Sequence, residues 1–218
     1  MNIMTIKQTY SSLVFMFCLF VATPVVAQAT RDADVASIAR AEKYLQDMKT
    51  AQSRFVQTTH DGTQLVGTFY LSRPGRLRFE YDPPIENFVV ADGTFIYFYD
   101  AELEEQTNAP IRASLANFFL RKNFSLSDDL IVKDAKFAAG LLQIKVVRAE
   151  EPEAGSITFA FSENEPFELK KWRVTDAQGM ITEIELFYLK TGMQHDKKLF
   201  RYFDPKRTGK NKKPAYNE

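Results

Sequence analysis

The 218-residue chain contains a single cysteine, Cys18, and only two histidines, His60 and His195. One cysteine excludes an internal disulfide, so the apolar core alone must hold the fold together. Neither histidine has a second histidine, cysteine or carboxylate at the spacing that metal sites use. The sequence therefore predicts no metal site.

The sequence also lacks the motifs that mark common catalytic and nucleotide-binding sites. It has no Gly-x-Ser-x-Gly nucleophile elbow, no P-loop and no dinucleotide fingerprint. Two carboxylate pairs, Glu104 with Glu105 and Asp128 with Asp129, lie in polar stretches, where a solvated surface is the commoner explanation. These absences indicate a binding protein, not an enzyme, that requires no cofactor.

Neither sign of charge is in excess, since 28 Lys and Arg residues balance 28 Asp and Glu residues. A nucleic-acid-binding surface normally shows as a basic excess, so this balance argues against a nucleic-acid partner. Aromatic residues are abundant instead, with 19 phenylalanines and nine tyrosines. These rings can fill a core, line a binding site, or do both.

Residues 1–27 differ in kind from the rest of the chain. Lys7 is their only charged residue, and residues 11–21 are almost wholly apolar. Val25 and Ala27 then occupy the −3 and −1 positions before a break. A positive start, a short apolar core and a small-x-small exit predict a secretory signal peptide that is cleaved after Ala27.

Two other readings of this segment are disfavoured. A membrane-spanning helix needs about 20 apolar residues, and Pro24 interrupts this run too early. A lipid-anchored cysteine needs a small residue before it, whereas bulky Phe17 precedes Cys18. We therefore expect a soluble protein in the periplasm of a Gram-negative bacterium, with one domain over 28–204.

Hydrophobic spacing predicts one helix, then strands, then a second helix and more strands. A stripe of Val35, Ile38, Ala41, Leu45 and Met48 predicts the first helix, over 35–49. Pro110 suits the first turn of the second, which ends near 122. The predicted strands cover 54–59, 64–71, 76–81, 88–91, 94–100, 103–107, 141–147, 156–161, 167–174, 181–189 and 199–203. The basic residues 205–218 are expected to form a frayed tail, and a role for them in binding a membrane or a partner stays open.

About ten strands with two helical interruptions predict an antiparallel sheet curled into a barrel or half-barrel. In strand 76–81 charged and apolar residues alternate, as expected when one face is in water. Strands 94–99, 156–161 and 185–189 are instead apolar on both faces. Helices can cover one face, and a lumen can account for the other. A sandwich core with some exposed aromatics explains the pattern equally well.

Five sequence pieces occur in a fixed order. They are Phe-Val-Gln at 55–57, Gly-Thr-Phe-Tyr-Leu-Ser-Arg-Pro-Gly-Arg-Leu-Arg-Phe-Glu-Tyr at 67–81, Pro84, Val-Ala-Asp-Gly at 90–93 and Ile-Tyr-Phe-Tyr-Asp at 96–100. This order resembles the outer-membrane lipoprotein carrier family, LolA. The resemblance extends over about residues 35–121, and beyond that only the rhythm of strands is shared. The family often has tryptophan where this chain has Phe79 and Tyr97 or Phe98, so aromatic character is kept.

The resemblance implies an unclosed antiparallel half-barrel of about eleven strands with an α-helical lid over its hydrophobic concave face. It implies a monomeric periplasmic chaperone that binds the acyl chains of lipoproteins released from the inner membrane. An inner-membrane ABC transporter of the Lol type would supply them, and the outer-membrane receptor LolB or an equivalent would accept them. A carrier of a different lipid, or a module that senses lipids through a protein partner, are the alternatives.

The resemblance also assigns residue roles. The family's arginine before proline corresponds to Arg73, which would latch the lid by donating hydrogen bonds to backbone carbonyls. The lid would comprise 35–49 and 109–122, with the candidates Ile38, Leu45, Ile111, Leu115, Phe118 and Phe119. Apolar strand residues are the candidates for the lipid-binding wall: Leu71, Leu77, Phe79, Phe88, Val90, Phe95, Tyr97, Phe159, Phe161, Trp172 and Leu186.

Overall fold

The computed structural model describes residues 30–114 and 116–208. The predicted signal peptide, the lid candidate Leu115 and the last ten residues of the basic tail lie outside the described residues. The elements, in chain order, are β1 (Arg31–Asp32), α1 (Val35–Asp47), β2 (Thr50–Thr58), β3 (Gln64–Ser72), β4 (Arg76–Tyr81), β5 (Phe88–Asp92), β6 (Phe95–Asp100), β7 (Glu105–Pro110), η1 (Ile111–Ala113), α2 (Ala116–Leu120), β8 (Leu130–Ala138), β9 (Leu141–Arg148), η2 (Pro152–Ala154), β10 (Gly155–Ser162), β11 (Leu169–Asp176), β12 (Ile181–Thr191), η3 (Lys197–Phe200) and α3 (Pro205–Thr208).

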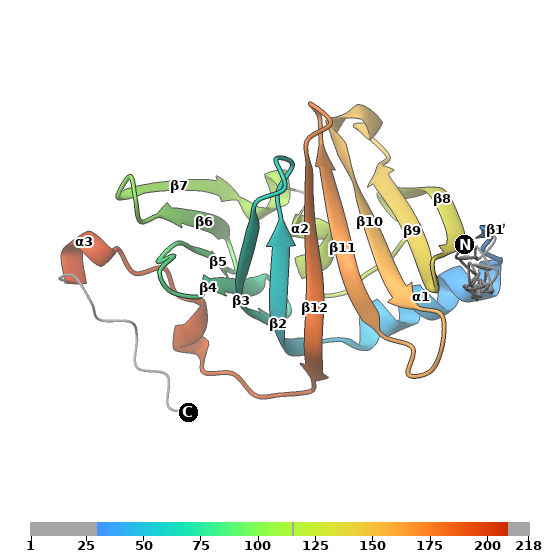
Figure 1. The fold of residues 1–218 in the computed structure, drawn as a ribbon, viewed down its shortest axis with the longest axis horizontal. Coiled ribbons are helices and arrows are strands. Elements are labelled where there is room, and N and C mark those ends of the chain that lie inside the picture. The colour runs from blue at the N-terminus through green and yellow to red at the C-terminus, as the bar shows by residue number, and fades with distance from the viewer. Residues whose placement is uncertain (1–29, 115, 209–218) are drawn as a thin grey trace, which may run out of the picture.

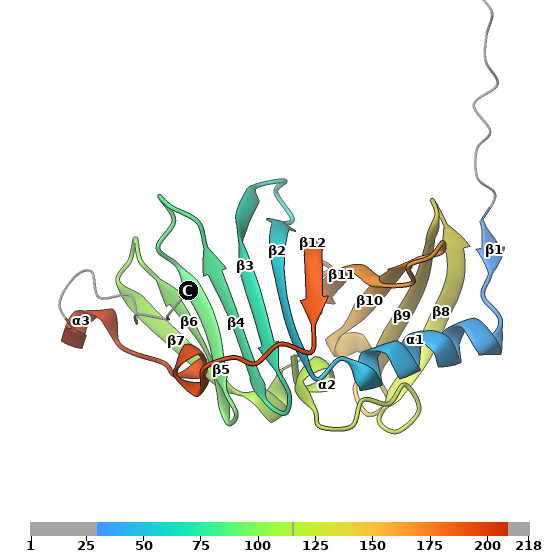
Figure 2. The same ribbon diagram turned by 90° about the horizontal axis from the view of Figure 1, so that it is seen from below.

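All twelve described strands belong to one antiparallel sheet in the order β1-β8-β9-β10-β11-β12-β2-β3-β4-β5-β6-β7 (Figure 1). The sheet curls without closing, so that β1 and β7 form its two edges (Figure 2). The predicted unclosed antiparallel half-barrel is confirmed. Its concave side is called the inner face below, and its convex side the outer face.

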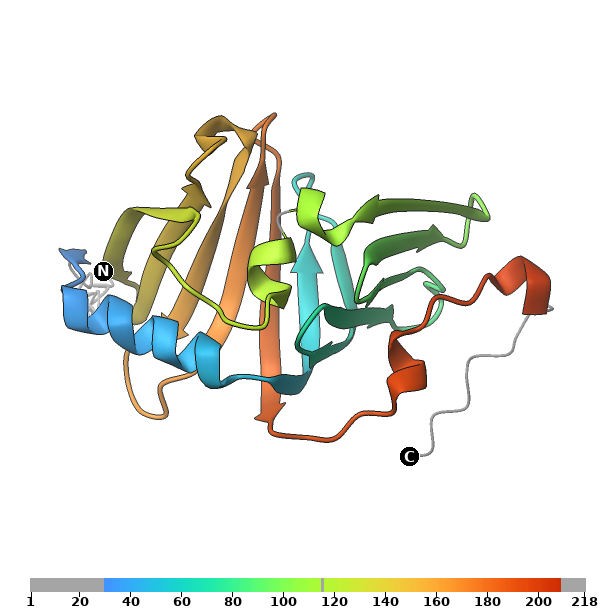
Figure 3. The same cartoon turned by 180° about the vertical axis from the view of Figure 1, so that it is seen from behind.

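Helix α1 lies across the inner face of β8–β11 (Figure 3). It begins where the Asp34 carboxylate accepts a 2.8 Å hydrogen bond from the Ser37 N–H, which satisfies one of the free donors at a helix start. Ala41 and Leu45 are fully buried against the sheet. The stripe read from the sequence therefore locates the helix to within two residues at its end.

Several predicted elements differ from the structure. The strand expected over 54–59 starts four residues earlier, as β2, and the strand expected over 167–174 lies two residues later, as β11. The helix expected over 110–122 is broken into η1 and α2, because Ser114 is extended and its hydroxyl bonds back to the Ile111 carbonyl at 2.9 Å. The strand predicted over 199–203 is wrong. There the Asp196 side chain accepts from the Lys198 N–H and starts the 3₁₀ turn η3. The strand expected at 103–107 starts two residues later, as β7, after a turn.

The sequence pattern missed β8 entirely. A register shift between Val132 and Asp134 interrupts its alternation against β9, so no period-two pattern continues through it. Two-residue strand β1 pairs with Phe137 and Lys136 of β8 at the sheet edge. Strands β1 and β8 are the described strands that the sequence pattern did not predict.

One apolar core fills the inner face, and Gly67 explains part of the sequence motif. A Cβ at Gly67 would lie 2.2 Å from the Glu80 carbonyl oxygen and 2.8 Å from the Phe55 ring. Only glycine therefore lets the fully buried Phe55 lie across β3, 5.1 Å from Phe79 and 5.4 Å from Tyr81 between ring centroids.

Candidate functional site

Strand register separates the predicted wall residues by face. Phe159 lies opposite Trp172, and Trp172 opposite Ile184, so these inward side chains form one row across β10–β12. Leu71 and Leu77 face each other on β3 and β4 in the same way. Seven candidates lie on the inner face. Six belong to its buried apolar core, Leu71, Leu77, Phe159, Phe161, Trp172 and Leu186, and the half-buried Phe79 packs against it.

The other four candidates, Phe88, Val90, Phe95 and Tyr97, lie on the outer face. Phe88 pairs with Glu80 and Val90 with Arg78, residues that alternate away from the inward Phe79. Tyr97 pairs with Val90 and shares its face. The eleven candidates therefore do not form a single lipid-binding wall, as expected from the sequence. Alternation of apolar residues along a strand separates its two faces but does not indicate which face is concave.

Residues 195–203, called the C-terminal segment below, nevertheless cover part of the outer face of β3–β6, although the outward Phe95 stays 36% exposed. Tyr202 stacks on Tyr97 with 4.6 Å between ring centroids, and His195 packs edge-on against Tyr70 at 5.8 Å. Beneath this segment Val90 is fully buried and Arg78 is only 5% exposed. The outward side of strand β4 is therefore partly covered, with Arg78 buried and Arg76 and Glu80 half-buried, whereas its alternating charges predicted a face in water.

Lid residues fill the centre of the inner face. The ring of Phe119 stacks on Trp172 at 5.4 Å and lies 6.3 Å from Phe159 and 6.2 Å from Phe69. Phe124, on the loop after α2, meets Phe159 edge-on at 5.9 Å. The chain's own aromatic rings thus occupy the most enclosed part of the half-barrel.

The remaining lid candidates lie around this centre. Leu45 and Ile111 are buried, and Ile38 is half-buried. Phe118 is also buried, with the guanidinium carbons of Arg121 and Arg148 at 4.9 Å and 5.3 Å from its ring centroid. Such cation–π contacts help to hold α2 in its position.

Arg73 connects the two lid segments. Its Nε donates a 2.6 Å hydrogen bond to the Phe119 carbonyl, and its Nη1 donates to the Leu45 carbonyl at the end of α1. Its guanidinium carbon also lies 4.9 Å from the Phe119 ring centroid and 5.8 Å from that of Phe124. One side chain from the end of β3 therefore holds α1, α2 and the following loop over the sheet.

Arg73 is held in this position at an electrostatic cost. It is 8% exposed, and burial lowers the pKa of its guanidinium to about 10. Its Nη2 has no hydrogen-bond acceptor among the described residues. The group stays charged at neutral pH, so its burial carries an unfavourable desolvation.

Additional contacts, which the sequence pattern did not indicate, link the lid segments to each other. Gln46 of α1 donates to the Phe124 carbonyl at 3.0 Å, and the Glu42 carboxylate accepts from the Leu126 N–H at 3.1 Å. Phe124 and Leu126 belong to an irregular loop with no periodic pattern. Long-range contacts of this kind are visible only once the fold is known.

No helix within the described residues covers the other end of the inner face. Neither α1 nor α2 crosses β5 or β6 (Figure 3). Phe98 lies on this face, opposite Val89, and is 39% exposed. We call the inward side chains Phe79, Val89, Ile96 and Phe98 the open end. It offers apolar surface beside a lid that fills the rest of the half-barrel.

Among residues 30–114 and 116–208, no cluster of three or more histidine, cysteine or carboxylate side chains is arranged to hold a metal ion. Within the same ranges, no helix combines the length and apolar character needed to span a membrane. What the described part of the chain does present is an apolar surface under a hydrogen-bonded cover.

Fold and site together define a half-barrel binding protein with a lid formed by its own chain. The sequence matches the family model for the outer membrane lipoprotein carrier protein LolA over residues 46–203, and the chain belongs to this family. The family resemblance drawn from the motifs is confirmed.

Curated relatives carry the name outer-membrane lipoprotein carrier protein. One from Methylococcus capsulatus is 28% identical over 174 residues, covering 76% of this chain and 83% of the relative. Another from Legionella pneumophila is 28% identical over 168 residues, covering 74% and 81%. A solved LolA superfamily protein from Nitrosomonas europaea aligns over 78% of this chain and 98% of its own, with 10% identity and a TM-score of 0.39.

Proposed function

We propose that this protein is a carrier that binds the acyl chains of lipoproteins on its inner face. The observation that carries the proposal is the apolar inner face of a LolA-family chain, covered by a lid that buried Arg73 ties down. The name of the curated relatives, outer-membrane lipoprotein carrier protein, agrees with it.

A lid of this kind solves a physical problem of carriers. Each buried methylene contributes roughly 0.8 kcal/mol, so an acyl chain in a permanently open apolar groove would be held too tightly to release. When Phe119 and Leu45 compete for the same surface, only the difference in free energy appears as affinity. Closing the lid then favours release of the ligand.

The wall that acyl chains would contact consists of the seven inward candidates named above. The open end, exposed before the lid moves, would make the first contact. Phe88, Val90, Phe95 and Tyr97 are left out of this proposal because they lie on the outer face.

We further propose the route of delivery. The mature chain would start at residue 28, after a signal peptide over 1–27, and act as a periplasmic monomer with its domain over 28–204. It would accept lipoproteins from an inner-membrane ABC transporter of the Lol type and pass them to LolB or an equivalent receptor. Residues 205–218 would form a basic tail outside the domain.

Depletion of the protein tests this function. Outer-membrane lipoproteins should then accumulate in the inner-membrane fraction. Their normal arrival in the outer membrane would refute the assignment. Mass spectrometry of lipid that copurifies with the protein would separate lipoprotein cargo from another lipid.

Arg73→Leu tests the latch. We expect acyl-chain binding at wild-type affinity or tighter, and hand-off to an acceptor slowed about tenfold, because the closed lid loses two hydrogen bonds of about 1 kcal/mol each. Transfer from the purified carrier to acceptor vesicles measures this. Arg76→Leu, on the outward side of β4, is the matched control. Normal hand-off by Arg73→Leu would remove Arg73 from the mechanism.

A further inference from the structure

The sheet is split between β11 and β12, near one rim of the half-barrel. In β11, Lys171 pairs with Ala160 of β10 and Leu169 pairs with the next residue, Phe161, so Lys170 is an extra residue without a partner in the ladder. On β12, Tyr188 and Leu189 together lie opposite a single residue of β2, Ser53. Two neighbouring strands therefore bulge at the same level, and each bulge bends its strand.

Pairing between these strands stops at Lys171 and Glu185. Beyond this point a cleft of about 380 Å³ opens. We call it the rim notch, and its lining comprises Glu168, Leu169, Lys170, Leu186, Phe187, Tyr188 and Leu189. The notch therefore separates three-residue stretches of two strands that elsewhere form a continuous ladder.

The notch connects the core with the surface. Leu169 and Leu186 are 1% and 6% exposed and belong to the inner-face core. At the outer end Phe187 is 40% exposed and Tyr188 is 84% exposed. The notch, lined by apolar side chains and by the Lys170–Glu168 ion pair, thus borders the proposed acyl-chain wall and opens to solvent.

Tyr188 adopts an unusual backbone conformation. Its φ of +56° lies in the left-handed region, which disfavours residues with a bulky side chain. The buried Ser53 hydroxyl donates a 2.8 Å hydrogen bond to the Phe187 carbonyl and so supports this bulge from the inner face. Unfavourable backbone conformations that neighbouring residues hold in place are frequent at binding sites.

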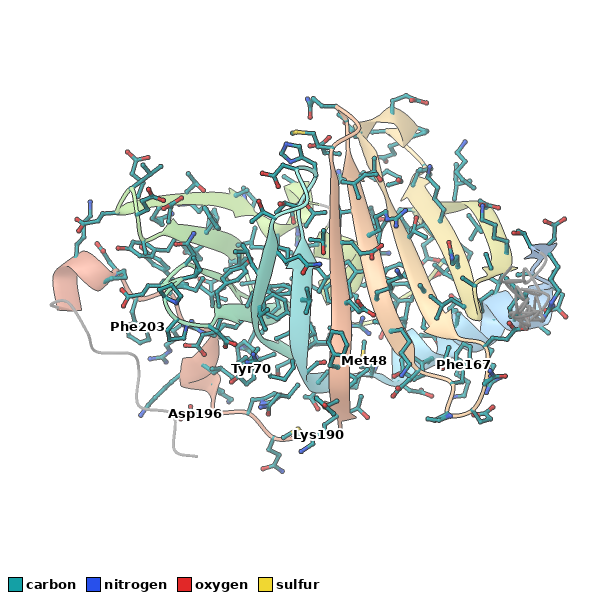
Figure 4. All side chains as sticks on the ribbon, in the orientation of Figure 1. Met48, Tyr70, Phe167, Lys190, Asp196 and Phe203 are labelled. Carbon is teal, nitrogen blue, oxygen red and sulfur yellow. The ribbon has the colours of Figure 1, made fainter. Side chains whose placement is uncertain are left out.

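The notch also lies beside the lid. Tyr44 of α1 packs edge-on against Phe161 at 5.7 Å and Phe167 at 5.9 Å, and Phe167 lies two residues before β11. Figure 4 shows Phe167 and Lys190 in the lower part of the sheet, at the ends of β11 and β12 that border the notch. A ligand in the notch would therefore emerge where α1 covers the half-barrel.

The residues that line the rim notch indicate which kind of ligand it can bind. Stretches 168–170 and 187–189 face each other without ladder pairing. Some of their main-chain groups are bonded elsewhere: both of Glu168 to Ser162, the Leu169 backbone to Tyr44 and the Phe187 carbonyl to Ser53. The main-chain groups of Lys170, Tyr188 and Leu189 have no ladder partner on the facing strand and suit a ligand with donors and acceptors. A hydrocarbon chain has neither. An extended peptide has both, and the exposed aromatics can flank its side chains. A lipoprotein combines acyl chains with a polypeptide, and the two surfaces here adjoin.

We propose that the rim notch binds the extended peptide segment joined to the acyl chains of the cargo. This inference rests on the proposed carrier function and adds the polypeptide part of the ligand to it. The notch makes the carrier selective for lipidated polypeptides over other lipids with the same chains.

Two probes with the same brominated palmitoyl chain test the proposal. One is N-palmitoyl-cysteine amide, and the other carries six further polar residues after the cysteine. Binding to the full chain is followed by bromine quenching of Trp172, the only tryptophan, which stacks on Phe119. We expect the peptide-bearing probe to bind about five- to tenfold tighter, as two or three net main-chain hydrogen bonds would give after the cost of ordering the peptide.

Two variants locate the effect. Deletion of Tyr188 removes the bulge while Phe187 and Leu189 keep their faces, so it should close the notch and abolish the preference without weakening the shorter probe. Tyr188→Gly keeps the left-handed backbone at no steric cost and should lose part of the preference. Phe203→Ala, which truncates another exposed aromatic (41%), should behave as wild type.

Equal binding of both probes by the wild type would overturn the proposal, as would a preference that survives deletion of Tyr188. Equally tight binding of the six-residue peptide without an acyl chain would also overturn it, in favour of a segment from a protein partner. If neither acylated probe binds, the carrier function itself fails, which is a separate and recognisable result.

Discussion

The two ends of the half-barrel carry their covers on opposite faces of the same sheet. In β9, inward Ile144 is 1% exposed while the outward Lys145 is exposed. In β5 and β6, outward Val90 is fully buried while inward Phe98 is 39% exposed. Strand alternation is similar at both ends, but a different cover lies on each: lid residues on the inner face of one, and the C-terminal segment on the outer face of the other.

This difference assigns separate tasks to the two ends. The covered end takes its stability from rings of the lid and the sheet, and under the proposed function it becomes accessible only when the lid moves. The open end keeps apolar inward surface in solvent and takes its stability from its outer face. A carrier that must both fold alone and accept an apolar ligand needs both arrangements.

The largest effect is expected from Phe159→Ala at the covered end. Phe159 is 1% exposed and touches both Phe119 and Phe124, so its removal leaves a cavity that costs about 3–5 kcal/mol of unfolding free energy. Urea unfolding measures it. A loss below 1 kcal/mol would mean that the lid does not pack on the sheet as described.

Phe200→Ala tests the outer cover. Phe200 is 2% exposed within the C-terminal segment, and its truncation should cost about 3 kcal/mol while leaving acyl-chain affinity unchanged. Unfolding and probe binding are measured on the same sample. A large loss of affinity would show that the two faces are not independent.

Tyr81 on β4 gives a pH-dependent marker between the two ends. Burial raises the pKa of its hydroxyl to about 12, although a hydrogen bond to Gln57 acts in the opposite direction. A raised folded-state pKa contributes stability that is complete below pH 10 and is lost between pH 10 and 12, by about 2–3 kcal/mol. Unfolding of wild type and Tyr81→Phe across this window measures the effect. Parallel curves for the two proteins would contradict the burial of Tyr81.

The smallest stability effect is expected at the open end. Phe98→Ala should change unfolding free energy by less than about 1 kcal/mol, because the ring is already 39% exposed. It should weaken acyl-chain binding about fivefold through lost contact area. Ile131→Ala, equally exposed on β8, is the control and should bind normally. Equal affinities for both variants would mean that the open end does not contact the ligand.

Local chemistry explains which elements were predictable. Asp34, the α1 stripe and the turn glycines are signals within a few residues, so α1 and most strands were located. Strand β8 was missed because its bulge breaks the period. The strand predicted near Leu199 failed because a side chain four residues before Phe200, that of Asp196, starts a 3₁₀ turn instead.

The sequence predicted the type of candidate site but only part of its residues. Family motifs identified Arg73, and the structure shows the contacts through which it reaches α1 and α2. Apolar alternation selected eleven wall residues, yet four of them lie outward. Phe124 and the notch at Tyr188 carry no sequence signal, since a loop has no period and a bulge is visible only against its partner strands.

The sequence by itself determined the alternating strands, the amphipathic first helix and the family, because these depend on neighbours along the chain and on ordered motifs. Only the tertiary structure decided which face of each strand is concave, what covers it and where the ladder splits. Those features depend on contacts between residues far apart in sequence, such as Arg73 with Phe119 and Tyr97 with Tyr202. The alternation of residues along a strand is the same whichever of its faces is buried, so the segment that covers the strand decides which face that is.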